Sequence, residues 1–192
     1  MFKKILVANR GEIAVRIIRA CKELNIKTVA IHSNVDTEAM HVKLADESIC
    51  VGSALPNESY LNIPSIISAI DISGADAVHP GYGFLSENDK FAKILSSHKV
   101  KFIGPTSKSI LELGNKSNAL KLASDFKLPI LGNKNSKNID NTSDAQKISK
   151  EIGMPVVIKA AYGGGGKGMR IFKNSSDCLL YTSDAADDLG RG

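Results

Sequence analysis

The sequence predicts an α/β fold, a Rossmann-like doubly wound parallel sheet followed by the start of a second domain. Short apolar runs alternate with stretches of helical spacing through residue 103, which is the pattern of a parallel sheet with helices on its faces. The alternation stops after Gly104-Pro105. A polar, glycine- and asparagine-rich connector then interrupts the later elements, as expected between separate units.

The first domain is expected over residues 1–112. The run at residues 4–8 is short and apolar, as in a strand that is buried on both faces. After Gly11, apolar residues recur at helical spacing while charged residues occupy the opposite face. By the same criteria we expect strands at residues 27–32, 48–51, 75–78 and 101–103, and helices at residues 36–45, 63–72 and 89–96.

The second domain is expected over residues 113–177, and residues 178–192 are expected to be a non-native tail. The tail turns abruptly acidic and resembles a translated sequencing-adaptor read-through; the alternative is a native acidic surface helix. Two short helices broken near Gly114 are expected within residues 107–126, across the boundary between the domains. The further elements expected in the second domain are a connector at 132–142, a helix at 143–152, and strands at 156–160 and 169–172.

Composition excludes several classes of protein. Apolar residues make up 43% of the 192 residues, which is too many for a disordered chain. The net charge is +5, but basic residues are not interleaved with aromatics, so nucleic acid is not an expected partner. Three cysteines and four histidines lack metal-ligand spacing. No apolar run approaches an export signal or a membrane span, so we expect a cytoplasmic protein without a membrane partner.

The run KAAYGGGGKGMR, from Lys159 to Arg170, is expected to bind phosphate. Glycines let backbone N–H groups approach phosphate oxygens closely, and a lysine at the end of a strand adds positive charge. The P-loop pattern fails, because Gly168 stands where Ser or Thr is required and a strand follows instead of a helix. The dinucleotide fingerprint fits the letters but lies at a hairpin. The alternative is a plain glycine turn, which needs far fewer glycines.

Two further motifs follow predicted strands. ANRGEIA, residues 8–14, lies where a Rossmann domain has three glycines, but it has only one. The negative charge of Glu12 also opposes a bound phosphate. We therefore interpret this motif as a structural turn. HPGYGFLSEN, residues 79–88, lies at the carboxyl end of a strand, where open α/β sheets place ligands. Tyr82, Ser86 and Glu87 are candidate contacts there. The alternative is a tight loop in which Ser86 caps the next helix.

Together these segments resemble biotin carboxylase, in particular the biotin carboxylase subunit of bacterial acetyl-CoA carboxylase. The resemblance covers residues 1–177 and rests on ANRGEIAVRIIRACKELNIKTVA, SYLNIPSIISA, HPGYGFLSEN, FIGP and the glycine run. The biotin carboxylase parts of propionyl-CoA and pyruvate carboxylases share most of these motifs and remain alternatives. SYLNIPSIISA favours the acetyl-CoA enzyme, which makes malonyl-CoA for fatty acid synthesis.

The resemblance implies an ATP-grasp ligase in which ATP, with Mg²⁺ (or Mn²⁺), phosphorylates bicarbonate to carboxyphosphate, and carrier-bound biotin is then carboxylated. It places Lys116 and Lys159 on the ATP phosphates. It makes Tyr82, Gly83 and Glu87 neighbours of biotin and bicarbonate. The glycines that it implies as a lid over the nucleotide are Gly163, Gly164, Gly165 and Gly166, the last two in direct contact.

The resemblance also implies which partners the protein has and which functional residues this chain lacks. Its members form homodimers and work with a biotin carboxyl carrier protein and carboxyltransferase subunits; Arg19 and Glu23, on the exposed face of the first helix, suit a dimer contact or a weak surface pair. The family's catalytic and metal-binding residues lie beyond residue 177, so none is assigned here. We expect the 192-residue chain to be inactive alone, and bicarbonate-dependent ATP hydrolysis by that chain would contradict this. A non-catalytic nucleotide-binding module is the remaining alternative.

Overall fold

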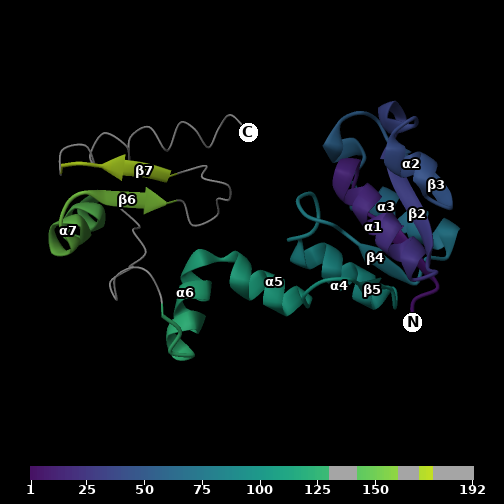
Figure 1. Cartoon of the computed structure of the whole chain (residues 1–192). Coiled ribbons are helices and arrows are strands. Elements are labelled where there is room, and N and C mark those ends of the chain that lie inside the picture. Colours follow the sequence, from purple (N-terminus) through teal and green to yellow (C-terminus); the bar gives the residue numbers. More distant parts are fainter. Residues whose placement is uncertain (130–141, 160–168, 175–192) are drawn as a thin grey trace. The chain divides into compact units, whose positions relative to one another are not determined.

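The computed structural model describes residues 1–129, 142–159 and 169–174 (Figure 1). The chain forms two compact units that divide between Gly114 and Asn115, and each is described by itself. Over the described ranges, no helix combines the length and the apolar character needed to cross a membrane.

The first unit contains a five-stranded parallel sheet of order β3-β2-β1-β4-β5. Strand order reverses at β1, which pairs with β2 on one side and β4 on the other, so the carboxyl ends of β1 and β4 form the topological switch point. The strands are β1 (Lys4–Val7), β2 (Lys27–Ser33), β3 (Glu47–Gly52), β4 (Ala77–His79) and β5 (Lys101–Phe102). The helices are α1 (Gly11–Glu23), α2 (Met40–Leu44), α3 (Ile63–Ser73), α4 (Asp89–Ser97) and α5 (Ser107–Gly114), with short 3₁₀ turns η1 (Asn34–Asp36) and η2 (Pro56–Glu58).

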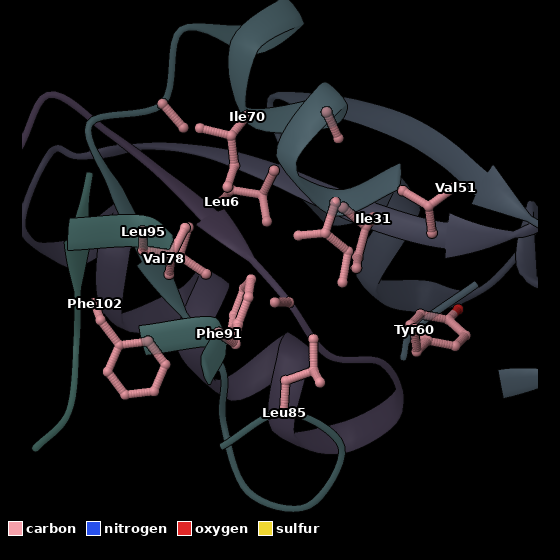
Figure 2. Close-up of a cluster of buried hydrophobic side chains, with 14 of the residues drawn as sticks. Leu6, Ile31, Val51, Tyr60, Ile70, Val78, Leu85, Phe91, Leu95 and Phe102 are labelled. Carbon is pink, nitrogen blue, oxygen red and sulfur yellow. The ribbon is translucent and has the colours of Figure 1, made fainter. Parts of the chain in front are cut away.

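Helices cover both faces of this sheet. Alternate residues of a strand point to opposite faces, and here both faces are apolar. Leu6 packs with Phe91 of α4 and with residues of α3 (Figure 2), whereas its neighbour Val7 packs with Ile18 of α1 on the other face. Each such side chain contributes about 1.5–3 kcal/mol when it is fully buried. The predicted α/β fold with a doubly wound parallel sheet is therefore confirmed.

One predicted helix, residues 36–45, is wrong in extent. The segment instead forms η1 and the short helix α2. Ala39 has an extended backbone (φ −66°, ψ 150°) and stands just before α2, so the helical hydrogen bonds cannot run through it. The carboxylate of Asp36 accepts hydrogen bonds from Ser33 and Tyr60, which hold the end of η1 against the sheet. Tertiary contacts therefore override the helical spacing in this segment.

The second unit contains α6 (Lys116–Asp125), α7 (Thr142–Ile152) and an antiparallel pair, β6 (Val156–Lys159) and β7 (Met169–Phe172). Asn115 caps α6, because its side-chain oxygen accepts the N–H of Asn118 at 3.1 Å. The strand pair confirms that the glycine-rich run joins two antiparallel strands. The connector predicted at residues 132–142 lies outside the described residues except for its last member.

Candidate functional site

The candidate site lies at the switch point, where the β1–α1 turn meets the β4–α4 loop. Asn9 and Arg10 follow β1, and residues 80–88 connect β4 to α4. The side chain of Asn9 is 3% exposed. Its Nδ2 donates to the carbonyl oxygens of Pro80 at 2.7 Å and Tyr82 at 2.8 Å, while its Oδ1 accepts the N–H of Arg10 at 2.8 Å. These three bonds fix the orientation of the amide and hold the two loops together.

Gly81 lies between the two carbonyls that Asn9 binds. Its φ is +66°, a conformation that side chains disfavour, and a Cβ there would stand 2.8 Å from Nδ2 of Asn9. The N–H of Gly81 donates to Nδ1 of His79 at 3.1 Å. Burial lowers the pKa of His79, which keeps the ring neutral with Nδ1 as an acceptor. The turn His79–Gly81 is thus specified by both a glycine and a neutral histidine.

Lowering the pH from 7.5 to 5.5 is expected to destabilise the first unit, and His79→Asn is expected to weaken that dependence. A histidine whose pKa is lower in the folded chain takes up a proton on unfolding. Its stabilising effect is therefore complete above the unfolded pKa of about 6.5 and is lost as the pH falls towards the folded pKa. Asparagine offers Oδ1 to the N–H of Gly81 but does not titrate.

Urea unfolding at several pH values measures this dependence. The buried His41, whose pKa burial also lowers, keeps part of the slope in His79→Asn. The exposed His98 provides the control His98→Asn, which should keep the full slope. Equal slopes for wild type and His79→Asn would contradict the neutral-histidine interpretation.

The structure exposes all three loop candidates, and one of them, Gly83, also lies in a left-handed turn. Tyr82 is 61% exposed, and its hydroxyl donates to the carboxylate of Glu12. Gly83 has a φ of +69° with open space where a Cβ would lie. Glu87 is exposed. Glu12 therefore has a structural partner in the loop, which fits the interpretation of ANRGEIA as a structural turn.

Ser86 does not cap α4, so that part of the sequence analysis is wrong. Asn88 is the cap: its side chain accepts the N–H of Phe91 at 2.8 Å. The N–H of Ser86 instead donates to the carbonyl of Gly83 at 2.9 Å, within the loop. Asparagine is as good a cap as serine, and its amide lies one residue before the helix, where a cap belongs.

A second cluster at the same edge was missed by the sequence analysis. The hydroxyl of Tyr60 donates to Oδ2 of Asp36 at 2.6 Å, and the guanidinium of Arg10 lies 3.3 Å from the same oxygen. Burial alone would raise the pKa of Asp36, but hydrogen bonds from Tyr60, Ser33 and Arg10 outweigh burial and hold it below its ordinary value. Burial and the Asp36 hydrogen bond raise the pKa of Tyr60 to about 12. Both groups therefore keep one charge state at neutral pH.

The nucleotide-binding candidates belong to the second unit. Lys116 is the first residue of α6, and Lys159 is the last residue of β6, where its backbone pairs with Met169 of β7. The side chains of both lysines, and the predicted lid residues Gly163, Gly164, Gly165 and Gly166, lie outside what the structure describes. Among the described residues, no three histidine, cysteine, aspartate or glutamate side chains gather closely enough to hold a metal ion.

Comparisons with known proteins cover both units. Residues 1–110 match the family model "Biotin carboxylase, N-terminal domain", and residues 115–188 match "Carbamoyl-phosphate synthase L chain, ATP binding domain". The biotin carboxylase of Haemophilus influenzae is 50% identical over 179 residues, which are 93% of this chain and 40% of that protein. The mitochondrial propionyl-CoA carboxylase alpha chain of Caenorhabditis briggsae is 52% identical over 193 residues, 98% of this chain and 26% of that one.

A solved structure gives the same relationship. The biotin carboxylase domain dimer of the 2-oxoglutarate carboxylase from Hydrogenobacter thermophilus, in complex with MgADP, ADP and bicarbonate, has a TM-score of 0.90 and 44% identity. The match covers 96% of this chain and 40% of the solved chain. The chain thus spans well under half the length of these relatives. Because the family model matches more than half of the chain, and the switch-point fold agrees with it, the chain belongs to the biotin carboxylase family.

Proposed function

We propose that this chain supplies the N-terminal part of a biotin carboxylase, which uses ATP and bicarbonate to carboxylate carrier-bound biotin through carboxyphosphate. The observation that carries this proposal is the match of both units, in order, to a biotin carboxylase N-terminal domain and an ATP-binding domain. A relative of 44% identity was solved with MgADP and bicarbonate, the nucleotide product and the carboxyl donor of such a reaction.

For ATP, we propose that Lys116, Lys159 and the backbone N–H groups of the lid glycines hold the phosphates. The donor set fits, because ammonium groups and glycine N–H groups are strong ligands for phosphate oxygens. The pairing of Lys159 with Met169 supports this, since Lys159 ends the strand before the glycine-rich connection and Met169 begins the strand after it. Mg²⁺ (or Mn²⁺) would be carried by the phosphates, whose charge it neutralises. No described residue is assigned to the metal.

For biotin and bicarbonate, we propose that the β4–α4 loop lies beside the reacting groups, with Tyr82, Gly83 and Glu87 as its contacts. The position of this loop at the switch point of the sheet supports the proposal, because open α/β sheets bind ligands there. Tyr82 and Glu87 are exposed, and Gly83 leaves its backbone open to a ligand.

We further propose the acetyl-CoA carboxylase as the parent enzyme, with propionyl-CoA and pyruvate carboxylases as alternatives. The segment SYLNIPSIISA favours it. The proposed partners are a biotin carboxyl carrier protein, carboxyltransferase subunits and a second copy of the chain in a cytoplasmic complex. The exposed Arg19 and Glu23 line a hollow beside α1 and α2 that suits the second copy. The domain limits 1–112, 113–177 and 178–192 are likewise proposed.

The test uses the full-length product of the gene that encodes this chain. The proposal predicts ATP hydrolysis that depends on bicarbonate and is stimulated by free biotin. Hydrolysis that is indifferent to bicarbonate would contradict it. Adding the carrier and carboxyltransferase from the same source, and comparing acetyl-CoA, propionyl-CoA and pyruvate as acceptors, then identifies the parent enzyme. Preference for either of the last two would overturn the acetyl-CoA assignment alone.

A further inference from the structure

The β4–α4 loop holds an unfavourable backbone conformation. Gly81, Gly83 and Phe84 all have positive φ, at +66°, +69° and +41°. Glycine accepts such angles without strain, but for Phe84 the left-handed conformation is unfavourable, because its Cβ crowds the backbone. A non-glycine residue keeps this conformation only where surrounding contacts impose it. The contacts of Phe84 therefore decide how the middle of the loop is presented.

Phe84 rests on an aromatic platform. Its ring stacks on Tyr60 with centroids 5.1 Å apart and an interplanar angle of 19°. Tyr60 is completely buried at the edge of the core, near Leu85 (Figure 2), and its hydroxyl both donates to Asp36 and accepts the N–H of Ser33 at 3.1 Å. The platform is thus fixed at both its ring and its hydroxyl.

Arg10 completes this arrangement from the β1–α1 turn. Its guanidinium carbon lies 5.4 Å from the centroid of Tyr60 and 5.9 Å from that of Phe84, so the three groups contact one another. The ion pair with Asp36, at 3.3 Å, holds the guanidinium there, and hydrogen bonding of its backbone N–H to Asn9 fixes the start of the side chain. Asn9 thus binds the loop at residues 80–82, and Arg10 binds it at Phe84.

We propose that Arg10 is a positioning residue for the carboxylation of biotin. This proposal rests on the proposed function. Arg10 acts through Phe84, because its guanidinium holds the left-handed turn. This turn presents Tyr82 and Glu87, which flank Phe84 in the loop. The charge of Arg10 contributes little to global stability, because its side chain is 43% exposed and exposed ion pairs are worth little. Its contacts with the rings of Tyr60 and Phe84 instead hold the loop, through Phe84, against the buried Tyr60 and the β1–α1 turn.

Hydrogen exchange of the 192-residue chain tests the local effect. In Arg10→Met, exchange at residues 83–88, which include the loop hydrogen bonds of Ser86 and Asn88, should rise about tenfold, since two ring contacts are lost. Exchange in β1 and β2 should stay within about twofold. Arg10→Lys, which keeps a cation over the rings, should recover part of the protection, and the exposed Lys22 provides the control Lys22→Met. Unchanged exchange in the loop, or an equal rise throughout the sheet, overturns the proposal.

Kinetics of the full-length gene product test the consequence. Arg10→Met should raise KM for free biotin about tenfold while KM for ATP and kcat stay within about twofold, and Arg10→Lys should lie between. A full-length enzyme that hydrolyses ATP without carboxylating biotin overturns the proposed function. An active enzyme in which Arg10→Met leaves KM for biotin unchanged overturns the positioning role alone.

Discussion

Asn9→Asp is expected to lower the free energy of unfolding of the first unit by about 3–5 kcal/mol at neutral pH. The change keeps the size of the side chain and the acceptor for the N–H of Arg10, but it replaces the amide donor by a carboxylate oxygen. That oxygen would face the carbonyls of Pro80 and Tyr82 at the 2.7 and 2.8 Å now occupied by hydrogen bonds, in a site that is 3% exposed. A buried oxygen without a hydrogen-bond donor is destabilising. In this variant both the carboxylate oxygen and the two carbonyl oxygens are left without the amide donor of Asn9.

Urea unfolding followed by circular dichroism, with exchange of β1 and β2 peptides as the marker of the first unit, measures this loss. Asn9→Ala removes the same bonds without adding charge and should cost less, about 2–3 kcal/mol. The exposed Asn57 supplies the control Asn57→Asp, expected within about 0.5 kcal/mol of wild type. If Asn9→Asp lies that close to wild type as well, Asn9 does not hold the loop.

Lys159→Gln in the full-length gene product is expected to lower kcat for bicarbonate-dependent ATP hydrolysis by about 10²–10³-fold, as when one charge-stabilising donor is removed from an active site. The proposed role of this lysine is to neutralise phosphate charge during phosphoryl transfer. Glutamine keeps the length of most of the side chain but loses the charge. Initial rates with and without bicarbonate measure the effect.

The exposed Lys150 in α7 gives a matched control, since Lys150→Gln removes a cation from the same unit without touching the glycine run. It should keep the wild-type rate within about twofold. A rate for Lys159→Gln that equals this control would contradict the assignment of Lys159 to the nucleotide phosphates.

Much of the fold follows from local patterns. The buried strands of the first unit are short apolar runs, and the amphipathic spacing of α1 places Ile18 against the sheet and Arg19 in solvent. The segment at residues 36–45 shows the limit, because its helical spacing is overridden at Ala39 by contacts between η1 and Tyr60, which is distant in sequence. No local pattern carries that information.

The candidate site was predictable in place but not in its internal contacts. The position of HPGYGFLSEN after a strand indicates the switch point. The polar Asn9 directly after the apolar run of β1 also indicates a contact at this edge, but the sequence analysis did not use it. The Arg10–Asp36–Tyr60 cluster joins three separate connections of the sheet, so only the folded chain brings it together. The roles of Lys116, Lys159 and the lid glycines stay predictions.

Transfer of radiolabel from bicarbonate to free biotin by the full-length gene product tests the proposed function most directly. Labelled carboxybiotin is expected to form only when ATP and Mg²⁺ are present, and to be reduced about 10²–10³-fold in Lys159→Gln, in step with ATP hydrolysis. An enzyme that binds or hydrolyses ATP but leaves biotin unlabelled would contradict the proposed function and would favour a nucleotide-binding module.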